Sequence, residues 1–458
     1  MVMDMTTGDP IRRILKFFIP VMLGNLLQQF YSMADSMIVS RYLGVDAFSG
    51  VSATGSLNFL ILGFALGLCS GFAIPVSQEF GAGDYSTMRR CFANGLYMAG
   101  GIAVVMALVT GLLSPQILRL MGTPENIFNY SLVYIRLIFF GIPATVLYNL
   151  LSGVLRAVGD GRTPLYMLLC STVLNIILDL LFVVTFNMGI AGAAIATVLA
   201  QLVSGLLCTG MICLKFDILH IRGAEWAADT HIMGRLLGIG VPMGLQFSIT
   251  AVGSTILQAS VNSLGSQAVA AVGAGAKVQF VFTTPLEAVG VTMATYCGQN
   301  LGARRIDRVR VGVRRITLIM FGYCVFAFVV QSFVGRTIAL LFIDRSEVQI
   351  LNMATHYLNI MVATSFLLAI VLIYRNAIQG LGFSRVAMLA GLMELIGRVF
   401  VALVLVRAMG FNGACFANPM AWICADLVLL PIYFFTVRRL EKRYTGEKAI
   451  EKKTDHAY

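Results

Sequence analysis

Long apolar runs dominate this 458-residue chain and constrain its fold more than any other feature. A run of about 20 apolar residues can cross a bilayer as a helix, because each residue advances the helix by about 1.5 Å. Hydrophobic residues make up 58% of the chain and charged residues only 12%, which leaves too few polar side chains to cover a soluble protein. The alternation typical of membrane barrels is absent. The sequence therefore predicts an all-α polytopic membrane protein.

Twelve apolar runs can be placed, and they fall into two sets of six. The most polar connector, 215–233, separates the sets, so we expect an N-lobe over 1–214 and a C-lobe over 234–437. A basic tail follows over 438–458. The predicted spans are 14–39, 50–75, 92–113, 128–152, 164–186, 190–214, 234–261, 268–296, 312–334, 354–380, 384–406 and 411–436.

The two halves of the chain repeat each other. Pro20 matches Pro242 in a similar context, and QEFGAG at 78–83 matches QNLGAR at 299–304, with an offset between 221 and 223 residues. Because each half holds six spans, both begin on the same side of the membrane and form parallel repeats. Transporters built in this way place their site between or within the halves, so the repeat favours transport.

The basic residues indicate how the chain is oriented in the membrane. Lys and Arg number 25 on the side of the two termini and five on the opposite side. This bias predicts cytoplasmic termini and a multi-pass protein of the cell membrane. The formal net charge of +11 is explained by this topology, so we expect membrane lipids rather than nucleic acid as partners.

Polar residues inside the N-terminal half form the strongest functional signal. Asn175 and Asp179 are four residues apart and share one helical face. Thr197 follows the next turn at a similar depth, and Asp35 lies in the first span. A carboxylate in such a setting costs on the order of 3 kcal/mol and is seldom left without a partner. We therefore expect these four residues to form one site.

The internal repeat supplies a control for this interpretation. Residues needed only for packing should recur in the second half, but Asp35 aligns with Leu257 and Asp179 with Ala402. The acidic pair is therefore specific to the N-terminal half, which favours a function for it.

The chemistry of the four side chains points to a small cation. Their hard oxygen atoms suit Na⁺. A proton suits them equally, because burial and a neighbouring like charge both disfavour an ionised carboxylate. Gln28 and Tyr31 lie on the same helical face as Asp35 and could support either ion. We expect H⁺ or Na⁺ as the coupling ion and no other cofactor.

Five charged residues of the second half could contact a substrate. Glu394 and Arg398 are spaced for an i,i+4 ion pair, which favours a buried structural bridge over a substrate contact. Lys277 and Glu287 lie ten residues apart on one span and are not an obvious direct pair. Arg375 could face a cavity or a lipid phosphate.

Several motifs together resemble the multidrug and toxic compound extrusion (MATE) transporters. They are the opening at 6–44, LRAVGDGRTP at 155–164, NIILD at 175–179 and MGIAGAAIAT at 188–197. The resemblance implies 12 helices in two six-helix lobes around a central V-shaped cavity, and the export of amphipathic, often cationic compounds by antiport. It also implies that Asp35, Asn175, Asp179 and Thr197 form the N-lobe cation site. We expect the protein to act as a monomer.

The chain departs from many members of that family in its second half. The stretch 241–258 of the seventh span lacks an acidic residue, and the stretch 361–378 of the tenth offers Arg375 instead. We therefore do not expect a C-lobe cation site. The main alternative is a flippase of a lipid-linked sugar or an exporter of an anionic metabolite from the wider superfamily. A membrane enzyme is disfavoured, because neither HExxH nor GxSxG occurs in the spans.

Overall fold

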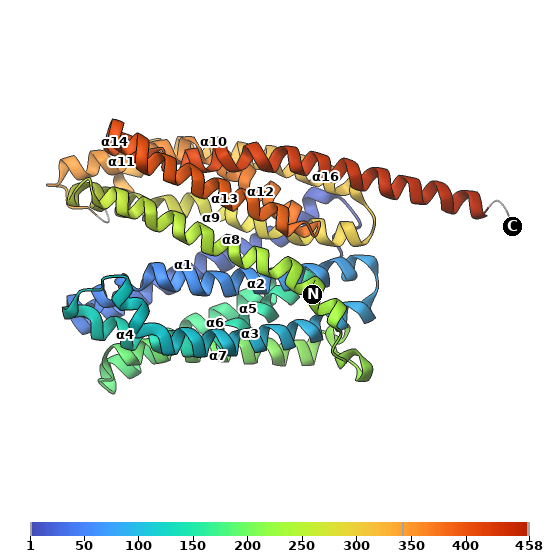
Figure 1. Cartoon of the computed structure of the whole chain (residues 1–458), viewed down its shortest axis with the longest axis horizontal. Coiled ribbons are helices and arrows are strands. Elements are labelled where there is room, and N and C mark those ends of the chain that lie inside the picture. Colours follow the sequence, from blue (N-terminus) through green and yellow to red (C-terminus); the bar gives the residue numbers. More distant parts are fainter. Residues whose placement is uncertain (1, 341–342, 456–458) are drawn as a thin grey trace. The chain divides into compact units, whose positions relative to one another are not determined.

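The computed structural model describes residues 2–340 and 343–455, and every regular element within these ranges is a helix (Figure 1). Contacts divide the chain into two compact units. Unit 1 comprises Met1–Met3, Ile19–Phe80 and Asp84–Ser248, and unit 2 comprises Asp4–Phe18, Gly81–Gly83 and Ile249–Tyr458. The lobe boundaries expected from the sequence stay a prediction.

Unit 1 is a helical bundle around one large apolar core. Phe72, Phe139 and Leu155 are among its largest fully buried side chains. Most of α1 and the first part of α8 belong to this unit. Its helices are α1 (Pro10–Ala53), α2 (Gly55–Ala82), α3 (Tyr85–Leu120), α4 (Glu125–Phe140), α5 (Ile142–Ala157), α6 (Arg162–Asp179), η1 (Leu180–Thr185), α7 (Gly189–Lys215), η2 (Asp217–Leu219), η3 (Gly223–Trp226) and α8 (Thr230–Asn262).

Unit 2 is a second bundle, in which α16 packs on α12 and α13, and α9 packs on α11 and α12. The end of α8 and the first residues of α1 also belong to it. Its other helices are α9 (Ser266–Gly302), α10 (Ile306–Ala339), α11 (Val348–Ala363), α12 (Ser365–Gly380), α13 (Ser384–Phe400), η4 (Val401–Leu405), α14 (Val406–Met409), α15 (Phe411–Cys415) and α16 (Ala417–Asp455).

The helices are long and apolar enough for an integral membrane protein. Among the described residues nine helices meet this criterion, and two bent pairs raise the number to 11. The first predicted span, 14–39, lies inside α1, which is not among them. The count of 12 spans therefore stays a prediction.

Two spans predicted as single helices, 128–152 and 354–380, are broken. Helices α4 and α5 bend by 48° at Gly141, and α11 and α12 bend by 46° at Thr364. Pro143 lies in the first turn of α5, where its missing N–H is tolerated. The hydroxyl of Thr364 donates to Ile360 O at 2.7 Å, and such side-chain bonds compete with the helical ladder. The predicted span 411–436 is likewise interrupted, at Phe416.

The predicted basic tail is helical as far as it is described. Helix α16 runs without interruption from Ala417 to Asp455, while the last three residues of the tail lie outside the described range.

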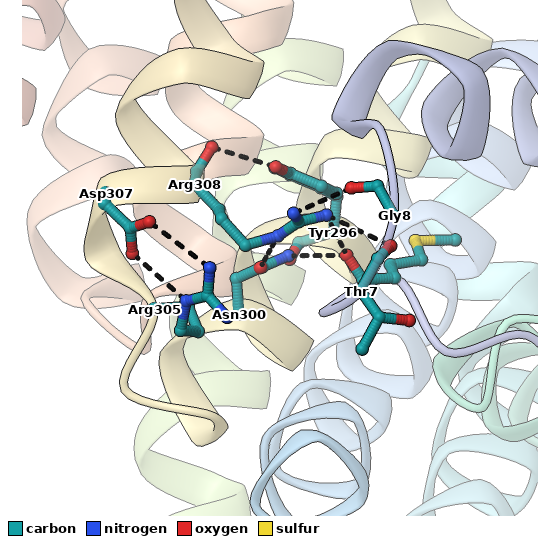
Figure 2. A network of polar contacts seen from close by, with 8 residues as sticks. Thr7, Gly8, Tyr296, Asn300, Arg305, Asp307 and Arg308 are labelled. Carbon is teal, nitrogen blue, oxygen red and sulfur yellow. Dashed lines mark hydrogen bonds and ion pairs between the residues drawn. The ribbon is translucent and has the colours of Figure 1, made fainter.

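A buried arginine in unit 2 fixes the N-terminal segment in front of α1 (Figure 2). The guanidinium of Arg308 donates to the carbonyl oxygens of Met5, Thr7 and Gly8 at 2.8 to 3.2 Å. Asn300 accepts from Arg308 Nε at 3.0 Å and donates to Met5 O at 3.3 Å. Three carbonyls with no helical partner are thereby satisfied by one side chain, which fixes the start of α1 in unit 2.

The connector between the two predicted lobes is held to α3 within unit 1. Glu225 accepts two hydrogen bonds from Arg89, both at 2.6 Å, and one from Ser86 at 3.1 Å. The bonds from Arg89 are the main reason that the pKa of Glu225 falls to about 2. A bidentate charge-assisted contact of this kind fixes the segment more firmly than a single bond would.

Candidate functional site

The helix that carries Asn175 and Asp179 changes its winding directly after the acid. Asp179 is the last residue of α6, and the six residues of η1 that follow are wound as a π-helix. Asn187, with φ 50°, and Gly189, with φ 62°, then turn the chain into α7, which carries Thr197. A second π-helix, η4, follows Phe400 at the equivalent place of the second half, so the winding belongs to the repeat and the acid is what distinguishes unit 1.

Three of the four predicted residues are buried, Thr197 is half-buried, and all four are poor in partners. Asn175 and Asp179 are fully buried, and Asp35 is 8% exposed. Within the described part of the chain no hydrogen-bond partner is found for either carboxylate oxygen of Asp179, for both amide atoms of Asn175, for Asp35 Oδ1 or for Thr197 Oγ1. Burying such groups without partners is costly, so the arrangement calls for a ligand or a proton.

Three of these side chains interact with Tyr31, which lies one helical turn before Asp35 on α1. The Tyr31 hydroxyl is buried, and its electrostatic interactions are with Thr197, Asp35 and Asp179. Asp179 also interacts with the charge of Asp35, although 144 residues separate the two acids in the sequence. We call Tyr31, Asp35, Asn175, Asp179 and Thr197 the unit 1 cluster.

Two residues near this cluster were missed from the sequence. Tyr134 on α4 is 6% exposed and interacts electrostatically with Asp35, Tyr31 and Asp179. Gln201 lies one turn beyond Thr197 on α7, and its buried Oε1 has no partner among the described residues. The helical spacing from Thr197 could have indicated Gln201. Gln28, by contrast, is half-buried, and no described polar contact joins its side chain to the cluster.

The unit 1 cluster offers oxygen ligands with at most two negative charges. No group of three or more Asp, Glu, His or Cys able to hold a metal ion occurs in the described ranges. Two carboxylates, an amide, a hydroxyl and a phenol match the preference of a hard monovalent cation. The same two carboxylates could share a proton.

Unit 2 has a different polar arrangement at its centre. Glu394 accepts a hydrogen bond from Arg375 at 2.8 Å and lies 3.5 Å from Arg398 Nη2. The i,i+4 pair expected from the sequence is therefore present, and Arg375 is its third member. We call these three residues the unit 2 ion-pair group. Arg398 also donates to Asn418 Oδ1 at 3.5 Å.

The other two candidates of the second half are not among the three residues of the unit 2 ion-pair group. Lys277 and Glu287 both lie on exposed positions of α9. Glu287 interacts with the charge of Arg375.

Long apolar helices in two units, each with buried ionisable side chains, define a polytopic membrane protein of the transporter class. The chain belongs to the MATE family of transporters, because the MatE family model matches residues 20–181 and 242–404. The starts of these two stretches lie 222 residues apart and their ends 223 apart, which agrees with the internal repeat.

Relatives extend this assignment. The chain is 32% identical over 307 residues to the "probable multidrug resistance protein YoeA" of Bacillus subtilis, a match that spans 65% of this chain and 66% of YoeA. It is 24% identical to the "FAD transporter" of Shewanella oneidensis over 81% of this chain and 82% of that protein. The fold matches a mutant of the Vibrio cholerae MATE transporter VcmN with a TM-score of 0.86, at 23% identity over 93% of this chain and 97% of that one.

Proposed function

We propose that this chain is a cation-coupled antiporter that exports amphipathic organic compounds across the cytoplasmic membrane by alternating access. The observation that carries the proposal is the unit 1 cluster, in which buried carboxylate, amide and hydroxyl atoms lack partners. Cation binding explains such a cluster better than a structural role does, because stability alone would favour apolar side chains there. The printed name of YoeA supports drugs as one substrate class.

The coupling follows from linkage between ion and substrate. An antiporter needs a site whose occupancy favours one facing of the protein, so that ion and substrate oppose each other's binding. Asp35 and Asp179 cannot both stay ionised at low cost without a positive charge between them. Binding of that charge would change the preferred packing of α1 against α6 and α7, and this change is the step that the substrate must reverse.

We favour protons over Na⁺ as the coupling ion. Dehydration of Na⁺ requires several well-placed oxygens, whereas a proton requires only a carboxylate that is easier to neutralise than in water. The complete burial of Asp179 supplies that condition. Na⁺ could still compete for the cluster, with Asn175 and Thr197 completing its shell.

We also propose that both termini and the connectors at 215–235 and 297–311 are cytoplasmic. The excess of Lys and Arg on that side supports this orientation. An Arg305→Cys variant in a background without other reactive cysteines should resist an impermeant thiol reagent in intact cells and react in inverted vesicles. Labelling from outside would reverse the orientation.

Accumulation of ethidium in a host that lacks its own pumps tests the export activity. Cells that express the protein should accumulate less ethidium than cells that express Asp179→Asn at the same level. If the two kinds of cell accumulate equal amounts of ethidium, and also equal amounts of a fluoroquinolone, the support for drug export would be removed.

A second candidate substrate class is an anionic metabolite. The name of the Shewanella relative supports it, as does Arg398, whose buried Nη1 has no partner among the described residues. Export of an anionic tracer that is inhibited by FAD, but not by ethidium, would favour this class.

A further inference from the structure

Asp426 on α16 is a buried acid that the sequence analysis did not single out. Its side chain is 6% exposed, and neither carboxylate oxygen has a hydrogen-bond partner among the residues that the structure describes. It lies in unit 2, outside the unit 1 cluster. Although the sequence led us to expect no cation site in the second half, we propose that Asp426 is a second proton-binding carboxylate of this protein, located in unit 2.

The neighbours of Asp426 explain why it differs from Glu394. The two acids interact electrostatically with each other and with Arg375. Arg375, however, donates to Glu394 at 2.8 Å, and Arg398 lies 3.5 Å from the other oxygen of Glu394. Both oxygens of Glu394 are therefore matched by arginine. Asp426 faces this negative charge without a donor of its own.

Among the described residues, no ion pair joins Asp426 to the remaining helices packed on α16. On α12, Tyr374 interacts electrostatically with Asp426, but a phenol carries no positive charge. The centroid of its ring lies 4.9 Å from that of Tyr433. Arg310 on α10 forms an ion pair with Glu441 at 3.8 Å, and Glu441 lies fifteen residues after Asp426 on α16. Helix α15 offers Cys415, and η4 has no titratable side chain. On α16 itself the nearest titratable groups are Cys424 and Tyr433.

A carboxylate in this position has two ways to avoid the cost of an unpaired buried charge. It can recruit a cation or bind a proton, and the proton needs no further ligands. If the protein is the antiporter proposed above, the proton of Asp426 adds to those exchanged at the unit 1 cluster. That last step rests on the proposed function, whereas the binding of the proton does not.

Labelling with dicyclohexylcarbodiimide tests the proton directly, because this apolar reagent adds to protonated carboxyl groups. The tryptic peptide 408–438 contains Asp426 as its single acidic residue, and the peptide 386–398 contains Glu394 as its single acidic residue. We expect about tenfold more adduct on 408–438 than on 386–398 at neutral pH, because arginines lie against both oxygens of Glu394, whereas neither oxygen of Asp426 has a donor among the described residues. The adduct should decrease as the pH rises and vanish in Asp426→Asn. Equal labelling, or labelling of 386–398 alone, would overturn the proposal.

Two further measurements complete the test. Asp426→Asn keeps the shape of a neutral acid, so it should unfold at or above the wild-type temperature, whereas a large loss of stability would identify Asp426 as an ionised structural group. Ethidium binding to the purified protein should release fewer protons from Asp426→Asn than from the wild type. Equal release would contradict the exchange of this proton, even where labelling shows that it is bound.

Discussion

Asp179 lies one helical turn after Asn175 on α6, and both side chains are fully buried with no hydrogen-bond partner among the described residues. An amide and a carboxylate on one helical face could have bonded to neighbouring helices, as Ser171 on the same helix does to Ala200 O at 2.9 Å. Their lack of partners, next to Asp35 and Tyr31, makes the unit 1 cluster the best candidate for the coupling site.

Removing either acid of the cluster should stop transport without unfolding the protein. Asp35→Asn and Asp179→Asn each remove a buried charge, so we expect coupled export to fall at least about tenfold while the unfolding temperature does not decrease. Export in energised vesicles and thermal unfolding in detergent measure the two effects. Asp46→Asn, an exposed acid on the same helix α1, is the matched control and should export at the wild-type rate. Wild-type export by both cluster variants would refute the assignment.

Glu394→Gln should have the opposite profile. It leaves Arg375 and Arg398 without their shared anion, and breaking a buried pair from one side costs about 3 kcal/mol or more. The free energy of unfolding should fall by that amount, whereas Glu347→Gln at an exposed position should change it by less than about 0.5 kcal/mol. A well-folded Glu394→Gln protein without transport activity would instead place Glu394 in the mechanism.

The connector contact predicts a pH dependence of stability. The pKa of Glu225 is lowered from 4.5 to about 2 in the folded protein, chiefly by its bonds from Arg89. The contribution of Glu225 to the free energy of unfolding is therefore complete at pH values above its pKa in the unfolded chain. It is lost as the pH falls from about 5 towards about 2. Glu225→Gln should lower stability by about 2 kcal/mol at neutral pH, and the difference should shrink in acid. A difference that stays constant down to pH 3 would contradict this cause.

The sequence predicted the membrane class and the acids of unit 1 because both depend on local patterns. Apolar run length indicates membrane helices, and the four-residue spacing of Asn175 and Asp179 is visible without a structure. Asp426 carries no such signal, since no polar residue lies three or four positions away on its helix face. Its importance arises only from the packing of α16 on α12 and α13. Tyr134 was missed for the same reason.

The broken spans illustrate a second limit. Gly141 and Pro143 are local signals that could have predicted the bend between α4 and α5. At the break near Thr364, the hydroxyl groups of Thr364 and Ser365 bond to backbone carbonyls, and hydropathy does not register such bonds.

Transport by the reconstituted protein tests the central claim most directly. Liposomes that contain the protein in Na⁺-free buffer should move ethidium against its gradient when a pH gradient is imposed, and Asp179→Asn liposomes should not. A Na⁺ gradient added without a pH gradient should drive little transport. Transport driven by Na⁺ alone and indifferent to pH would contradict proton coupling, and equal transport by wild type and Asp179→Asn would contradict the site itself.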